Sequence, residues 1–108
     1  MTQPKLEVTD QSGQRVVDVT KDPFSIGRRV GSDLRLPNGA VSRDHAEIVA
    51  VGDRCEIRDR GSRYGTFING EEVKQRKLAH GDRIKLGRSG GAELTFLSRD
   101  EAAGSSPD

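Results

Sequence analysis

Short stretches in which apolar and polar residues alternate run along most of the chain, and turn residues separate them. A period of two places successive side chains on opposite faces of a strand, so this pattern predicts an all-β sandwich or barrel. The alternation is clear at Phe24 and Ile26, and again at Leu34 and Leu36. The predicted strands cover residues 5–9, 15–20, 24–28, 33–37, 45–51, 55–59, 66–68, 83–87 and 92–98.

Local signals add a hairpin and a boundary to this pattern. Asn69-Gly70 follows the predicted strand 66–68, and both residue types tolerate the positive φ that a type I′ hairpin turn requires. Residues 71–80 come nearest to a helix, but they have no clean apolar stripe. Residues 99–108 are small and polar, so we expect a domain over residues 1–98, then a disordered tail or the start of a linker.

Composition narrows the class of protein. The 108 residues suffice for one domain, and 13 glycines with 31% hydrophobic residues are typical of a small β core with many turns. Lys and Arg number 18 against 17 Asp and Glu, so coating of nucleic acid or of an anionic membrane is disfavoured, and any basic site is local. The single cysteine, Cys55, excludes an intrachain disulfide, and we expect a buried, inert thiol. Without a membrane-length apolar run or a secretory segment, a soluble, cytoplasmic protein is the default expectation.

The stretch "VSRDHA" (41–46) raises the question of catalysis, because it holds a serine and a histidine three positions apart. Side chains three apart in a loop or at a strand start seldom face each other, and no acid stands in an obvious position to orient the imidazole. Two histidines, His45 and His80, and one cysteine lack any metal-ligand spacing, and no nucleotide-binding phosphate loop occurs. We therefore predict no enzymatic activity, no metal and no cofactor.

Arginines and serines gather where the predicted strands end. Arg28 leaves one strand, Ser42 and Arg43 lie in a second loop, and Ser62 and Arg63 lie in a third. Forked guanidinium groups and short hydroxyl donors are the groups that a phosphate dianion prefers. A solvated charged surface is the alternative, since 32% of the residues are charged, and composition alone leaves both interpretations open.

Four segments together resemble the forkhead-associated (FHA) domain in order and spacing: "FSIGRRVGSDLRLP", "VSRDHAEI", "DRGSRYGTFINGEEV" and "LAHGDRIKLG". The resemblance covers roughly residues 5–98. It includes the Gly-Arg pair, Ser-x-x-His and Gly-Thr followed by Asn-Gly. It implies a two-sheet antiparallel sandwich of about eleven strands, whose apical loops bind a phosphothreonine peptide through a small pocket for the threonine methyl group.

Carried onto this chain, the resemblance implies that Arg28 pairs with the phosphate and that the Ser42 hydroxyl donates to it. Arg43 contacts the phosphate region or the peptide, and His45 braces the loop rather than touching the ligand. In the third loop, Ser62, Arg63 and Tyr64 are also expected to bind the phosphate or the peptide. Further structural support is expected from Gly27, Gly65, Thr66, Asn69 and Gly70.

One position departs from the family pattern. Members often carry an asparagine before the Gly-Thr pair, and its amide holds the main chain of the ligand, but this chain has Tyr64 there. The expected partner is a threonine-phosphorylated protein or peptide, in another protein or in the domain's own full-length chain. The alternative is a structural or oligomerisation module that ignores phosphate. Nucleic-acid binding is disfavoured by the charge balance and by only four aromatic residues, three of them expected in the core.

Overall fold

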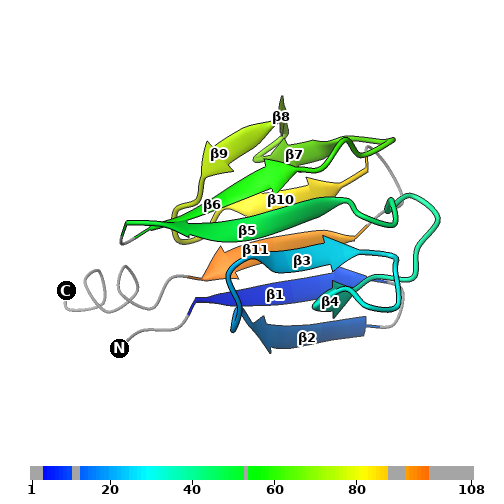
Figure 1. Ribbon diagram of the computed structural model, residues 1–108, viewed down its shortest axis with the longest axis horizontal. Helices are drawn as coiled ribbons and strands as arrows, with labels where there is room; N and C mark the ends of the chain where they lie inside the picture. The colour runs from blue at the N-terminus through cyan, green and yellow to red at the C-terminus, as the bar shows by residue number, and fades with distance from the viewer. Residues whose placement is uncertain (1–3, 11–12, 53, 88–91, 98–108) are drawn as a thin grey trace.

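The structure is a computed structural model that describes residues 4–10, 13–52, 54–87 and 92–97. In that part of the chain, eleven β-strands form two sheets and no helix occurs (Figure 1). The two-sheet architecture confirms the predicted all-β sandwich. The predicted tail, residues 99–108, lies outside the described residues, and the domain boundary at residue 98 stays a prediction.

The first sheet has six strands, and all of its neighbouring pairs are antiparallel. In its centre, Leu6 pairs with Phe96 and Val8 with Leu94, so apolar side chains face the core together. Its strands, in order across the sheet, are β2 (Gly13–Asp18), β1 (Lys5–Asp10), β11 (Glu93–Leu97), β10 (Arg83–Leu86), β7 (Thr66–Ile68) and β8 (Glu71–Val73).

The second sheet has five strands. It is antiparallel except where β3 and β4 pair in parallel over two residues, a departure from the purely antiparallel sandwich that was expected. Its strands, in order, are β4 (Leu34–Arg35), β3 (Phe24–Gly27), β5 (Ala46–Val51), β6 (Arg54–Asp59) and β9 (Gln75–Lys77).

The core lies between the sheets and is built from the residues that the period of two assigns to the inner faces. Phe24 and Ile26 of β3 pack with Leu94 and Phe96 of β11, and all four are at most 2% exposed. Burial of such side chains is the main favourable contribution to the folded state. The core fixes the two sheets relative to each other, and therefore fixes the strand ends that carry the loops.

Some expectations differ from the structure. Residues 71–77 form the short edge strands β8 and β9, which their charged sequence does not reveal because both lie mostly exposed. Cys55 was expected to be buried, but it is only half-buried and packs at the margin of the core. Burial raises the pKa of its thiol, as does the nearby Asp22, so the group stays protonated and unreactive near neutral pH.

Three loops gather at one end of the sandwich, on the right in Figure 1: the β3–β4 loop (28–33), the β4–β5 loop (36–45) and the β6–β7 loop (60–65). We call this end the apex. Among the described residues, no helix is long and apolar enough to cross a membrane. Those residues also contain no group of three or more His, Cys, Asp or Glu that could hold a metal ion.

Candidate functional site

Ser42 is the residue on which the three apical loops converge. The main-chain N–H of Arg28 donates to the Ser42 carbonyl at 2.9 Å, which ties the β3–β4 loop to the β4–β5 loop. The main-chain N–H of Arg63 donates to the Ser42 hydroxyl oxygen at 2.9 Å, which brings in the β6–β7 loop. The structure therefore places Arg28, Ser42 and Arg63 together, although 35 positions of sequence separate the outer two.

Gly27, at the end of β3, makes this convergence possible. A Cβ atom there would lie 2.0 Å from the carbonyl oxygen of Arg43 and 3.1 Å from that of Ser42. Both are main-chain atoms, which cannot swing aside as a side-chain tip can. The β4–β5 loop thus lies directly on the bare backbone of β3, and the adjacent Arg29 N–H donates to the Arg43 carbonyl at 3.3 Å.

His45 is completely buried and braces two loops from within. Its Nδ1 accepts the main-chain N–H of Ser42 at 3.0 Å, so the ring proton resides on Nε2, which donates to the Gly65 carbonyl at 2.8 Å. Burial lowers the pKa of the imidazole, while the bond to Gly65 and the charge of Asp59 oppose that effect. Both ring nitrogens are occupied by the main chain, so neither can act as a base for the Ser42 hydroxyl. The nucleophile–base pair is therefore disfavoured by geometry.

The Ser42 hydroxyl is held in place and still has a proton to give. Its oxygen accepts from Arg63 N–H, and within the described ranges no acceptor for its own proton occurs. The residue is half-buried and so is not sealed inside the core. A preplaced donor of this kind can bind an anion at little further cost in side-chain ordering.

Arg28 is exposed, and one of its three guanidinium nitrogens is held by a main-chain carbonyl. Its Nε donates to the Val41 carbonyl at 3.0 Å, beside Ser42 in the chain. The two terminal nitrogens make no hydrogen bond or ion pair with the residues that the structure describes. They form the fork that binds carboxylates and phosphates with two parallel hydrogen bonds.

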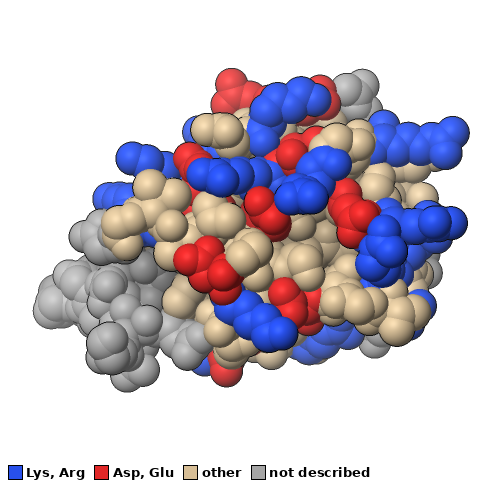
Figure 2. All heavy atoms as spheres, viewed as in Figure 1, with Lys and Arg blue, Asp and Glu red and all other residues tan. Residues whose placement is uncertain are grey.

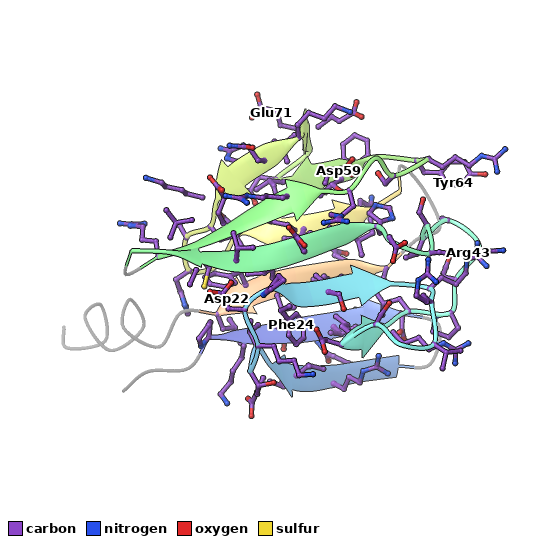
Figure 3. All side chains as sticks on the ribbon, in the orientation of Figure 1. Asp22, Phe24, Arg43, Asp59, Tyr64 and Glu71 are labelled. Atoms are coloured by element: carbon purple, nitrogen blue, oxygen red, sulfur yellow. The ribbon has the colours of Figure 1, made fainter. Side chains whose placement is uncertain are left out.

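Arg43 is also exposed, and Figure 3 shows it at the apex. Next to it, the exposed pair Arg29 and Asp44 is bidentate, with Nε to Oδ1 at 3.1 Å and a terminal nitrogen to Oδ2 at 2.8 Å. The hydrogen bond from Arg29 lowers the pKa of Asp44, and the charges of Arg29, Arg60 and Arg43 add to the effect. The charge of Arg29 is therefore balanced by Asp44, whereas Arg43 interacts with Asp44 only through the charge and makes no hydrogen bond to it.

Asp59, at the end of β6, organises the β6–β7 loop, and the sequence analysis missed it. Its carboxylate accepts the main-chain N–H groups of Gly61 and Ser62, both at 3.0 Å, and the hydroxyls of Ser62 and Thr66. Burial alone would raise the pKa of this carboxyl, but these hydrogen bonds hold it below the usual value. The available signal was an aspartate two residues before the Gly61-Ser62 pair, where its side chain can bond the following main chain.

Ser62 and Thr66 consequently stabilise the β6–β7 loop, because both hydroxyls donate to Asp59. The Ser62 hydroxyl donates to Asp59 and accepts the main-chain N–H of Gly65 at 3.0 Å, so its single proton is already used. Ser62 was expected among the ligand-binding donors, and the structure instead turns it toward the interior of its loop. Gly65 supplies the carbonyl that accepts from both His45 and Gly87 N–H, the latter at 2.9 Å.

Arg63 and Tyr64 form the outer tip of the same loop. The guanidinium carbon of Arg63 lies 5.8 Å from the centroid of the Tyr64 ring, within the range of a cation–π contact. Tyr64 is 48% exposed, and Figure 3 shows it projecting from the apex. The ring occupies the position where the family pattern often has asparagine.

Asn69 and Gly70 confirm the predicted hairpin but do not reach the apex. Their φ angles of 51° and 89° fit a two-residue turn between β7 and β8. The Asn69 side chain accepts Arg83 N–H at 3.0 Å and donates to Asp82 at 3.1 Å. Arg83 begins β10, whose opposite end carries the contact with Gly65, so this pair supports the sheet at a distance from the site.

Comparison with known proteins relates the sequence of this chain to one family. The sequence profile of the FHA domain matches residues 24–87, which include all three apical loops. The oxoglutarate dehydrogenase inhibitor of Corynebacterium jeikeium is 39% identical over 83 residues, which are 77% of this chain and 56% of that protein. The chain thus spans about half the length of that curated relative.

Solved structures agree with the sequence comparison. One, studied for phosphothreonine-dependent FHA domain interactions, has a TM-score of 0.79 at 34% identity and covers 89% of this chain and 96% of its own. Another is the FHA domain of FhaA complexed with the intracellular domain of Rv3910. Its TM-score is 0.76 at 34% identity, over 86% of this chain and 98% of its own.

Proposed function

Because the chain belongs to the FHA domain family, whose members bind phosphothreonine peptides, we propose that its apex docks a threonine-phosphorylated segment through Arg28 and Ser42. The segment belongs either to another protein or to the domain's own full-length chain. FHA domains are non-enzymatic binding modules, and this proposal assigns no catalysis. It places the interaction in the cytoplasm, where kinases have ATP to phosphorylate threonine.

The observation that carries the proposal is the Ser42 hydroxyl. Arg63 N–H fixes its oxygen, and its proton is left to be donated beside the anchored fork of Arg28. A phosphothreonine presents three acceptor oxygens and about −1.5 to −2 charges at neutral pH, which matches one short donor and one guanidinium fork. Free carboxylates or neutral threonine hydroxyls match this arrangement less well.

The remaining residues have two kinds of role in this proposal. Arg43, on the loop of Ser42, contacts the phosphate region or the peptide main chain, and Arg63 and Tyr64 contact the peptide. Bracing of the loops is assigned to Gly27, His45, Gly65, Ser62, Thr66 and Asp59. Asn69 and Gly70 fix the β7–β8 hairpin.

Fluorescence anisotropy with a degenerate phosphothreonine peptide pool and its unphosphorylated twin tests the proposal. Two or three charge-assisted hydrogen bonds, partly offset by desolvation and peptide ordering, suggest binding near 1 μM, or about −8 kcal/mol. The unphosphorylated pool should lose at least about 3 kcal/mol, more than a hundredfold in affinity. Equal binding of both pools, or none by the folded protein, would support the phosphate-independent structural module instead.

A further inference from the structure

We propose that Arg63, in cation–π contact with Tyr64, binds an acidic side chain next to the phosphothreonine, so that the domain selects acidic phosphothreonine segments. This inference rests on the proposed function and deepens it. It assigns to the loop tip a selectivity that the phosphate contacts of Arg28 and Ser42 do not provide by themselves.

The first argument is the charge balance at the apex. Arg28, Arg43 and Arg63 are exposed there, and none makes an ion pair with the described residues. The carboxylate next to Arg43 in the chain, Asp44, already forms a bidentate pair with Arg29. Figure 2 shows Lys and Arg protruding at this end of the molecule.

This local excess stands out because the whole chain carries a formal net charge of only +1. A bound phosphate of about −1.5 to −2 charges would balance Arg28 and much of Arg43, which is also within the field of Asp44. Arg63 would then be the remaining apical arginine that makes no ion pair with the described residues. A carboxylate supplied by the ligand is the group that restores the balance.

The second argument is the placement of the Arg63 side chain. Its main-chain N–H is fixed to the Ser42 hydroxyl, so the side chain begins at the edge of the phosphate site. Its guanidinium then lies over the Tyr64 ring, with its central carbon 5.8 Å from the ring centroid. A cation–π contact of this kind leaves the N–H donors of the guanidinium available for a bidentate carboxylate. The donors therefore lie at the loop tip, on a residue whose main chain borders the phosphate site.

The third argument is that the platform is rigid. Asp59 binds the main chain of Gly61 and Ser62, and Ser62 in turn holds Gly65 N–H, so both ends of the loop that carries Arg63 and Tyr64 are tied. A fixed tip lowers the ordering cost of an ion pair, which otherwise cancels much of its gain at a surface. An exposed pair of this quality should change affinity by about threefold to fivefold.

The test measures dissociation constants for phosphothreonine peptides in which one flanking position at a time carries Glu or Gln. Wild type should prefer Glu by about threefold to fivefold at one or two positions, and the ratio should fall toward 1 in Arg63→Gln. Arg63→Lys keeps the charge but loses the planar fork and the ring stack, so its ratio should be intermediate. Raising the salt concentration should reduce the wild-type ratio.

The matched control is Arg54→Gln, which removes the same charge from an exposed residue at the other end of β6 from Asp59. Its Glu-to-Gln ratio should equal that of wild type. A wild-type ratio of 1 at every position, or a preference that survives Arg63→Gln, overturns the inference while leaving phosphate dependence intact. Loss of any difference between phosphorylated and unphosphorylated peptides would instead overturn the proposed function, and this inference with it.

Discussion

Replacing Gly27 by alanine should disrupt the apex from a position that touches no ligand. The added Cβ would meet the Arg43 carbonyl oxygen at 2.0 Å, and the oxygen would have to retreat by about 1 Å before the contact becomes tolerable. The carbonyls of Arg43 and Ser42 accept the two hydrogen bonds that join the β3–β4 and β4–β5 loops. A shift large enough to relieve the clash therefore weakens both bonds and displaces Ser42.

The expected loss of stability follows from these contacts. Overpacking against a well-packed backbone costs about 1–3 kcal/mol, and two weakened hydrogen bonds add about 0.5–1.5 kcal/mol each. We expect Gly27→Ala to lower the free energy of unfolding by about 2–6 kcal/mol in urea denaturation. At temperatures where the variant is still folded, phosphopeptide affinity should fall at least about tenfold, because the Ser42 donor has moved.

Gly39→Ala is the matched control, since Gly39 lies in the β4–β5 loop and a Cβ there meets nothing within 4 Å. It should leave stability within about 1 kcal/mol of wild type, with any change tending to stabilise by restricting the unfolded chain. The reasoning is refuted if Gly27→Ala and Gly39→Ala unfold at the same denaturant concentration and bind the phosphopeptide equally well.

The remaining predictions concern two loop residues and pH. Ser42→Ala should weaken phosphopeptide binding by about 1.5–3 kcal/mol in anisotropy titrations, whereas Ser62→Ala should mainly lower the denaturation midpoint; equal effects of both on binding would contradict the assigned roles. Asp59→Asn places an amide N–H donor against other donors, so it should lower the free energy of unfolding by about 1–3 kcal/mol. An unchanged urea midpoint would contradict the role of Asp59 in holding the β6–β7 loop. Because burial lowers the pKa of His45 in the folded state, the unfolded state takes up the extra proton as pH falls below about 6.5. Stability should therefore be constant with respect to this group above pH 6.5 and decrease below it, and His45→Gln should remove that slope. Phosphopeptide affinity should also weaken below about pH 6, where the phosphate loses its second charge, and a flat profile would exclude a phosphate-centred site.

Much of the fold was readable from local pattern, and the reasons are physical. Buried strands such as β3 and β11 show a period of two because their inner faces must be apolar. Asn69-Gly70 predicts the turn because the turn needs a positive φ at both residues and few residue types tolerate one. The edge strands β8 and β9 gave no such signal, since exposed edges impose little pattern on their side chains.

The site was readable in part for a similar reason. Arg28, Ser42 and Arg63 stand out as donors in three loops, but their meeting depends on hydrogen bonds that span 14 and 21 positions, which no local pattern encodes. Asp59 and Ser62 illustrate the difficulty. In the sequence, Asp59 is the last residue of a predicted strand and Ser62 is an ordinary loop residue. Only the structure shows that the Asp59 carboxylate accepts the Ser62 proton, which is then not available to a ligand.

Amide-resolved NMR of the labelled domain, titrated with a phosphothreonine peptide, tests the central claim most directly. The account predicts that the largest shifts occur at the amides of Arg28, Ser42, Arg43 and Arg63, and that the unphosphorylated peptide leaves those amides unchanged. Shifts confined to an outer sheet face, or identical shifts with both peptides, would contradict a phosphate-binding apex.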